Sequence, residues 1–283
     1  MGSMIIGPYT ITPVVTSRFG LDGGAMFGVV PKTLWSRQAR VDEQNRIDMV
    51  TRTLVLRSAD RVILVDTGNG DKWADKYRSI YRIETENYVL PESLTALGIH
   101  AEDVTDVICT HLHFDHAGGN TRRKNDRIVP TFPNATYWIQ QANWELANAP
   151  SEKDRASYLS ENWAVLAENG MIKLLDGETE LAKGIRLHVV NGHTSGQQLP
   201  IVSDGQRSLL YGGDLFPMRA HIPVPWVMAY DIAPMTTIAE KNAILPRMVD
   251  EEWILFFEHD PETTACTVTR TDRGFAPGEQ VDL

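Results

Sequence analysis

Hydrophobic residues along this chain fall into short runs separated by turn-forming residues, which is the pattern of β-strands joined by loops and helices. Residues 4–15 and 51–66 predict two strand regions, and the Ser58-Ala59-Asp60 segment divides the second region into a hairpin. The run from Val62 to Val65 is apolar at every position. We therefore expect this strand to be covered on both faces.

The rest of the chain predicts further strands and helices. Strands are expected over residues 104–110, 135–139, 172–175, 185–190, 198–203, 207–211 and 253–257, with a hairpin turn at Asp204-Gly205. Helices are expected over 91–97, 140–148, 151–170 and 237–249; a capping-box-like pattern at Ser151 opens the third, and Pro246 kinks or shortens the last. The glycine-rich segment from Phe19 to Trp35 is expected to be a long loop or a loose hairpin. The aromatic residues between positions 73 and 88 indicate a lid or a subunit contact, and the latter would make a homodimer.

Both halves of the chain run strands first and a helix later. We therefore expect one domain over residues 1–283, built from two similar half-domains at roughly 4–170 and 171–283. No linker-like segment divides the sequence, and 42% hydrophobic residues suffice for a sizeable core.

The densest cluster of reactive side chains follows the apolar run of residues 104–109. It comprises His111, His113, Asp115 and His116. The first two histidines stand two positions apart where the chain leaves a strand, so both rings should project to one side. The glycine pair at positions 118 and 119 permits the following turn without Cβ clashes. Four potential ligands exceed the needs of one catalytic ion with an open position, so the sequence predicts two metal ions.

Three more potential ligands follow predicted strands, where α/β proteins place their chemistry. They are His193, Asp214 and His259. The whole set contains five of the eight histidines of the chain and two carboxylates, a donor set suited to zinc, with manganese, cobalt or iron as alternatives. A chance collection of histidines in a polar loop is disfavoured by this density. Asp66, which ends another strand, has two open interpretations: it orients a ligand imidazole, or it caps a turn.

Composition narrows the partners. A net charge of −10 disfavours a nucleic-acid-binding protein. No stretch approaches the length and hydropathy of a membrane span, and the first residues lack the features of a signal peptide. Cys109 and Cys266 cannot make a disulfide framework. We expect a protein of the reducing cytoplasm.

Taken in order, these motifs resemble the metallo-β-lactamase superfamily, over nearly the whole chain. The match consists of a strand ending in Asp66, the HxHxDH motif from His111 to His116, and the three later ligands. The resemblance implies an α/β protein of α+β four-layer type, an αββα sandwich of two mixed sheets flanked by helices. It also implies that His111, His113 and His193 hold one metal, that Asp115, His116 and His259 hold the second, and that Asp214 bridges the two.

Some positions distinguish branches of this family. Two-zinc β-lactamases usually carry cysteine where this chain has Asp214, and the tail lacks the Lys/Arg cluster of the glyoxalase II branch. The segment from Leu21 to Gly28 makes the chain most similar to N-acyl-homoserine lactonases and methyl parathion hydrolases. Lactonases of that branch often have a tyrosine three residues after the bridging aspartate. Here that position is Pro217, and Tyr230 is the candidate substitute.

The mechanism implied by this resemblance needs two metals that share one water. Their joint effect lowers the pKa of that water enough to give hydroxide near neutral pH. The hydroxide would attack a lactone or ester carbonyl, or a phosphotriester phosphorus. Asp214, as the bridge, and Asp115, as a candidate proton donor to the leaving alkoxide, are the expected catalytic residues, although ligation alone also explains Asp115.

The expected substrate pocket is formed by loop residues that the resemblance places near the metals. They are Phe27, Phe216, His221, Trp226, Met228 and Tyr230. An apolar wall of this kind suits an acyl chain or an aryl leaving group. Core packing is the equal alternative for the apolar members, and a surface or structural histidine is the alternative for His221.

The leading interpretation is a metal-dependent hydrolase of ester bonds, most similar to quorum-quenching lactonases. The alternative is an organophosphate or aryl-ester hydrolase at the same site. A non-catalytic, metal-stabilised binding protein would be indicated by a missing ligand, and all seven ligands are present. The expected partner is a small-molecule lactone, ester or phosphotriester.

Overall fold

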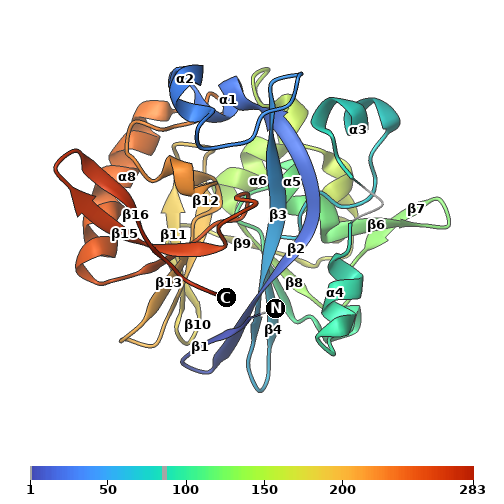
Figure 1. Ribbon diagram of the computed structural model, residues 1–283. Coiled ribbons are helices and arrows are strands. Elements are labelled where there is room, and N and C mark those ends of the chain that lie inside the picture. Colours follow the sequence, from blue (N-terminus) through green and yellow to red (C-terminus); the bar gives the residue numbers. More distant parts are fainter. Residues whose placement is uncertain (1, 85–87) are drawn as a thin grey trace. The chain divides into compact units, whose positions relative to one another are not determined.

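The computed structural model describes residues 2–84 and 88–283 of the chain. These residues form two compact units (Figure 1). Unit 1 contains residues 1–19 and 50–177, and unit 2 contains residues 20–49 and 178–283. The boundary at residue 177 lies near the expected division of the chain, but the segment 20–49 joins the C-terminal unit. A single domain over residues 1–283 stays a prediction.

Unit 1 is built on a mixed sheet. In spatial order its strands are β1 (Met4–Ile6), β2 (Tyr9–Asp22), β3 (Arg46–Arg57), β4 (Val62–Val65), β5 (Asp106–Ile108), β8 (Thr136–Gln140) and β9 (Ile172–Leu175). The pairs β1–β2 and β3–β4 are antiparallel, whereas β4, β5, β8 and β9 run parallel to their neighbours in this order. A separate hairpin of β6 (Thr121–Lys124) and β7 (Arg127–Pro130) projects from the unit (Figure 1).

Short helices connect the strands of unit 1. They are α3 (Asp75–Tyr81), α4 (Leu90–Ala96), α5 (Phe114–Ala117), α6 (Gln141–Asn148) and α7 (Ala164–Glu168), with 3₁₀ turns at Ala101–Asp103, Gly118–Asn120, Arg155–Ser157 and Ser160–Asn162. The expected helix over residues 151–170 is wrong: only α7 is α-helical there. The predicted capping residue Ser151 instead donates its hydroxyl to Asp154, at 2.6 Å between the oxygens, inside an irregular segment.

Unit 2 contains the second mixed sheet. In spatial order its strands are β10 (Thr179–Ala182), β11 (Ile185–Val190), β12 (Gln197–Ser203), β13 (Ser208–Tyr211), β14 (Ile254–Phe256), β15 (Ala265–Thr271) and β16 (Gly274–Gln280). Only β13 and β14 pair in parallel among these described strands. The predicted hairpin turn at Asp204-Gly205 is confirmed, because Gly205 has a φ of 89° and the Asp204 carboxylate accepts from two backbone N–H groups.

The helices of unit 2 correct two expectations. The segment from Phe19 to Trp35 is not a long loop: β2 continues to Asp22 and is followed by α1 (Gly23–Phe27) and α2 (Lys32–Trp35). The long helix is α8 (Pro234–Asp250). It starts before the expected Thr237, and Pro246 does not shorten it, because the helix continues to Asp250. Proline at the first helical position explains the earlier start. Two 3₁₀ turns, Gly213–Leu215 and Arg219–His221, lie between β13 and α8.

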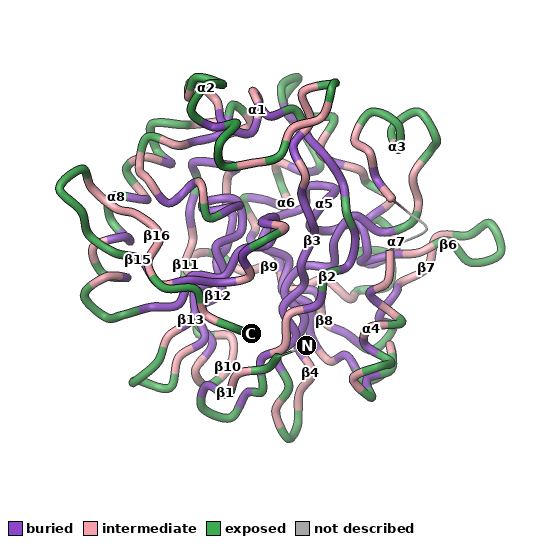
Figure 2. Tube along the Cα trace, viewed as in Figure 1, coloured by how far each residue is buried: buried purple, intermediate pink, exposed green. Residues whose placement is uncertain are grey.

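Each unit has its own hydrophobic core. In unit 1 the core includes Leu64, Val107, Tyr137 and Leu166, and in unit 2 it includes Leu210, Phe216, Leu245 and Leu255. Figure 2 shows inner strands such as β3 and β13 as largely buried, whereas the edge strands β9, β10 and β16 contain no buried residue. The three residues from Ile63 to Val65 are fully buried, which confirms the prediction for the apolar strand.

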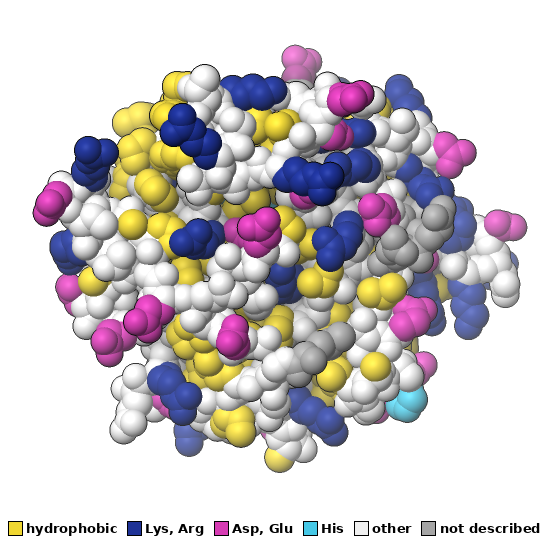
Figure 3. All heavy atoms as spheres, in the orientation of Figure 1, with side chains coloured by type: hydrophobic (Ala, Val, Ile, Leu, Met, Phe, Trp, Pro, Cys, Tyr) yellow, Lys and Arg dark blue, Asp and Glu magenta, His cyan; other side chains and the backbone are white. Residues whose placement is uncertain are grey.

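The expectations about fold class hold: each unit combines a mixed sheet with helices, and the chain is of the α/β class. Among the described helices, none combines the length and hydropathy that crossing a bilayer requires. On the face seen in Figure 3, Lys and Arg side chains are interspersed with Asp and Glu side chains.

Candidate metal centre

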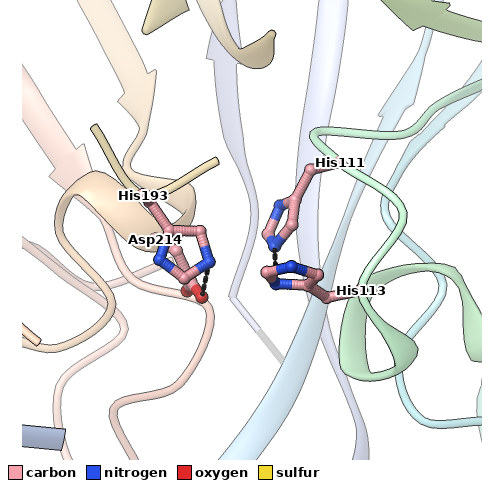
Figure 4. Close-up of side chains that lie close together, drawn as sticks. All are labelled: His111, His113, His193 and Asp214. Atoms are coloured by element: carbon pink, nitrogen blue, oxygen red, sulfur yellow. Dashed lines mark hydrogen bonds and ion pairs between the residues drawn. The ribbon is translucent and has the colours of Figure 1, made fainter. Parts of the chain in front are cut away.

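The ligand loop of unit 1, residues 109–119, carries four of the expected ligands and begins directly after β5. His111 Nε2 lies 2.9 Å from His113 Nδ1, so the two rings converge as the alternation of side chains predicts (Figure 4). The next four residues form α5, a single helical turn that carries Asp115 and His116. Asp115 Oδ1 lies 3.8 Å from His116 Nε2. All four residues are buried, with at most 7% of the surface of each residue exposed.

Asp66 orients one of these histidines. Its Oδ2 lies 3.0 Å from His116 Nδ1, and because a carboxylate only accepts, the ring donates from Nδ1 and keeps its Nε2 lone pair for a ligand. The same carboxylate accepts from the backbone N–H and the hydroxyl of Thr110, each at 2.7 Å. Asp66 also has a positive φ of 55°, which is unfavourable for a residue with a Cβ. The contact with His116 is the one expected of a residue that orients a ligand.

The end of the ligand loop is packed tightly against residues 67–70. A Cβ at Gly118 would overlap the Asn69 carbonyl, and one at Gly119 would overlap the Tyr88 hydroxyl. Gly118 itself is helical, with a φ of −58°, so close approach rather than a left-handed turn requires glycine there. Lys72 donates to the carbonyls of Gly118 and Thr121. Burial lowers the pKa of this lysine to about 8.

The aromatic segment near position 73 packs on the same loop. Phe114 stacks with Tyr81 at 5.2 Å between ring centroids and meets Trp73 edge-on at 5.0 Å. Within the described residues, the segment expected as a lid or subunit contact therefore covers the ligand loop of its own unit. Residues 85–87 of that segment lie outside the described residues. The homodimer stays a prediction.

In unit 2, three strand ends deliver the remaining expected ligands. His193 follows β11, Asp214 follows β13 in a 3₁₀ turn, and His259 follows β14. The Asp214 carboxylate presents one oxygen to each ring: Oδ2 lies 3.1 Å from His193 Nε2 (Figure 4), and Oδ1 lies 3.2 Å from His259 Nε2. All three side chains are buried. Asp214 thus faces two potential ligands at once, and its role as a bridge between two metals stays a prediction.

Asp231 is a functional candidate that sequence reasoning missed. Its Oδ1 accepts from His193 Nδ1 at 3.0 Å, which leaves Nε2 facing Asp214. Its Oδ2 accepts from the Thr237 hydroxyl at 2.9 Å. Asp231 and Asp66 therefore play the same part for one histidine in each unit.

The expected pocket residues all lie in unit 2, in different environments. Phe27 is fully buried, stacked with Trp35 and His221 and met edge-on by Trp226. Phe216 belongs to the hydrophobic core and Met228 is buried, whereas Trp226 and Tyr230 are half-buried. Contact of these residues with a substrate stays a prediction.

His221 matches the structural alternative. The ring is 1% exposed and donates from Nε2 to the Met26 carbonyl at 2.9 Å. The pKa of His221 is lowered to about 4, mainly by burial; the hydrogen bond to the Met26 carbonyl opposes this shift, and the charge of Lys241 contributes to it. The imidazole is therefore neutral at pH 7 and holds two backbone segments together.

The donor set of each unit fits divalent ions of the zinc type. Two nitrogens that each lie about 2.0–2.1 Å from one zinc ion cannot be more than about 4.2 Å apart. The His111 and His113 nitrogens, 2.9 Å apart, satisfy this limit. In unit 2 a buried carboxylate lies between two imidazole nitrogens, and imidazole with carboxylate is a common ligand set for zinc.

The chain has recognisable relatives. The family model of the metallo-β-lactamase superfamily matches residues 47–259. An N-acyl homoserine lactonase from Bacillus sp is 26% identical over 228 residues, which cover 76% of this chain and 83% of that protein. Another from Bacillus cereus is 27% identical over 175 residues, which cover 59% of this chain and 63% of the relative, less than two thirds of its length.

Solved structures agree with the fold. A probable metal-dependent hydrolase from Staphylococcus aureus has a TM-score of 0.87 and 29% identity, covering 99% of this chain and 100% of that one. The dizinc quorum-quenching lactonase AidC, solved with a product, has a TM-score of 0.81 at 20% identity, covering 100% of this chain and 98% of that one. At that identity the second likeness shows the fold alone.

Proposed function

Because the chain belongs to the metallo-β-lactamase superfamily, we propose that it is a dinuclear metallohydrolase that opens lactones, of the quorum-quenching type. The observation that carries the proposal is the Asp214 carboxylate, which presents one oxygen to His193 and the other to His259. The N-acyl homoserine lactonases among the relatives support the choice of substrate.

The proposed ligands follow the order of the motifs. His111, His113 and His193 are assigned to one zinc ion, Asp115, His116 and His259 to the second, and Asp214 to both. When bound, two such ions activate a water and polarise a substrate oxygen. Asp66 and Asp231 hold the rings of His116 and His193 in the tautomer that leaves Nε2 available. Asp115 is the proposed carrier of a proton to the leaving alkoxide oxygen.

The proposed substrate wall is apolar and neutral. The Phe27 and Trp226 rings meet edge-on at 5.7 Å, and the nearby His221 ring carries no charge at pH 7. Such a wall favours the acyl chain of a neutral lactone over a phosphorylated metabolite.

Both cysteines are buried free thiols, which supports the expectation of a reducing cytoplasm.

A substrate panel tests the proposal. The zinc-loaded chain is assayed with N-acyl-homoserine lactones of increasing acyl length, with aryl esters, and with aryl phosphotriesters. We expect the highest kcat/KM for lactones. This activity should be lost in His111→Ala but kept in His188→Ala, because His188 lies outside the ligand set and pairs with Glu178. A phosphotriester turned over about tenfold better than every lactone would select the alternative hydrolase. No turnover of any ester would reject the proposal.

Tyr230 provides a separate prediction. This half-buried tyrosine directly precedes Asp231, and its hydroxyl is the proposed donor to the substrate oxygen in place of the tyrosine absent at Pro217. We expect Tyr230→Phe to lower kcat for lactones about 100-fold, the effect of removing one donor to a developing oxyanion. Tyr77→Phe, at an exposed tyrosine, is the control. Unchanged turnover in Tyr230→Phe would show that the side chain only packs.

A further inference from the structure

The segment between Asp214 and Asp231 is closely tied to the expected ligands of unit 2. It starts at Asp214 and returns to His193, because Asp231 accepts from His193 Nδ1 and the Ile232 N–H donates to the His193 carbonyl at 3.1 Å. In its first half, the Pro217 carbonyl accepts from the His259 backbone N–H at 3.1 Å. We call residues 215–230 the wall loop, since it carries most of the proposed substrate wall.

One buried side chain, Lys241 of α8, holds the middle of the wall loop through hydrogen bonds to its backbone. Lys241 is 0% exposed, and its Nζ donates to the carbonyls of His221, Pro223 and Trp226 at 2.6, 2.9 and 3.0 Å. An ammonium has three N–H donors, so all of them are used. Burial lowers the pKa of Lys241 to about 7, and the charge of Asp231 opposes that shift. Such burial is costly unless the charge is hydrogen-bonded, and the three carbonyls replace the lost water.

Two of the three carbonyls that Lys241 holds belong to proposed wall residues, His221 and Trp226. The His221 ring stacks on Phe27 at 4.9 Å, and the Trp226 ring meets Phe27 edge-on. The Ala229 N–H also donates to the Ala25 carbonyl at 2.8 Å. The α1 segment and the wall loop are therefore joined by hydrogen bonds and ring contacts, while Lys241 holds the backbone of the loop.

Neighbouring positions on α8 hold the ligand segments rather than the wall. Thr237 donates to Asp231, and Glu240 accepts from the backbone N–H groups of Asn191 and Gly192, directly before His193. Positions 237, 240 and 241 share one face of a helix. Lys241 differs from the other two because the three hydrogen bonds of its ammonium group all go to the wall loop.

We propose that Lys241 determines substrate selectivity, by fixing the wall loop against which the acyl chain of the lactone packs. The inference rests on the proposed function, and Lys241 acts as a positioning residue: its Nζ binds the backbone of the loop and lies 5.6 Å from the centroid of the Phe216 ring. A wall whose carbonyls are held at three points cannot adapt to chains of different length, whereas a released loop loses that discrimination. A released loop must be ordered again when a long acyl chain binds. Each flexible side chain that is immobilised in this way lowers the affinity about two- to tenfold.

The test compares Lys241→Met, which removes every donor, with Lys241→Gln, which keeps two. Arg247→Met is the matched control, because it removes an exposed cation from the same helix. Hydrogen exchange by mass spectrometry follows peptides of the wall loop and, as a reference, peptides of β12. Steady-state kinetics measure kcat and KM for short and long acyl-homoserine lactones. Metal content of each variant is measured alongside.

In Lys241→Met we expect faster exchange confined to the wall loop and an unchanged metal content. The preference for the long over the short chain should fall about tenfold through KM, with kcat for the short chain within about twofold of wild type. Lys241→Gln should lie between wild type and Lys241→Met in both the exchange of the wall loop and the chain-length preference. If Lys241→Met does not fold, Lys241→Gln decides the test. Unchanged exchange or unchanged selectivity in a folded variant overturns the role of Lys241. Wild-type inactivity on the whole panel instead rejects the proposed function, and the exchange data then still decide whether Lys241 fixes the loop.

Discussion

Treatment with a strong chelator should abolish hydrolysis by this chain, and zinc, manganese or cobalt should restore it. Without a Lewis acid, water has a pKa near 15.7, so hydroxide is negligible at pH 7, about 10⁸-fold less abundant than at a site that lowers this pKa to about 7. The buried imidazole and carboxylate groups of both units are the donor types that hold such ions. We expect turnover of lactones to fall below about 1% of its initial rate and to recover on metal addition.

Two measurements make this prediction specific. Metal analysis should find two ions per chain before chelation and fewer than one after it. The Tm should fall on chelation, because ligands that bind only the folded state stabilise it by mass action, by about 4 kcal/mol at a thousandfold excess over Kd. His111→Ala should reproduce the loss without chelator, and His188→Ala should behave as wild type. Full activity in a preparation shown to contain no metal would contradict the two-metal mechanism.

The placement of the candidate ligands within each unit could be predicted from the sequence because its signals are local. His111, His193, Asp214 and His259 each follow an apolar run that predicts a strand, although the observed strands β5 and β14 are shorter than those runs. The structure accordingly brings His111 to His113, and Asp214 to both His193 and His259. The two interpretations of Asp66 could not be separated in this way, since its contact with His116 spans 50 residues.

Other features depend on contacts that no local pattern reveals. Asp231 reaches His193 across 38 residues, from a loop without periodicity. Residues 20–49 join the C-terminal unit, where Phe27 packs on His221 and Trp226. Pro246 does not end α8, although proline removes a helix hydrogen bond, because Leu245 and Met248 on either side of it are buried in the core of unit 2. In each case tertiary packing overrides the local preference.

Truncation of Asp231 should weaken metal binding although Asp231 is not itself a proposed ligand. Its carboxylate fixes the His193 ring by accepting from Nδ1 at 3.0 Å, and loss of such a partner typically costs about 10–100-fold in metal affinity or activity. We expect Asp231→Ala to show this loss in a competitive zinc titration, with a similar fall in kcat/KM. Asp231→Asn keeps an acceptor oxygen, so its loss should be smaller.

Controls separate this effect from general destabilisation. Asp106→Ala truncates another buried aspartate, one that accepts from Trp138 and lies 3.6 Å from Arg61, and it should leave zinc affinity unchanged while lowering Tm. Thr237→Val removes only the hydroxyl that holds Asp231, a hydrogen bond worth about 0.5–1.5 kcal/mol, so its effect on zinc affinity should be the smallest of the series. The loss of zinc affinity should decrease in the order Asp231→Ala, Asp231→Asn, Thr237→Val. This order is expected if contacts run from α8 through Asp231 to His193. If Asp231→Ala binds two zinc ions as tightly as wild type, the His193 ring is oriented by other contacts and Asp231 serves only the packing of the loop.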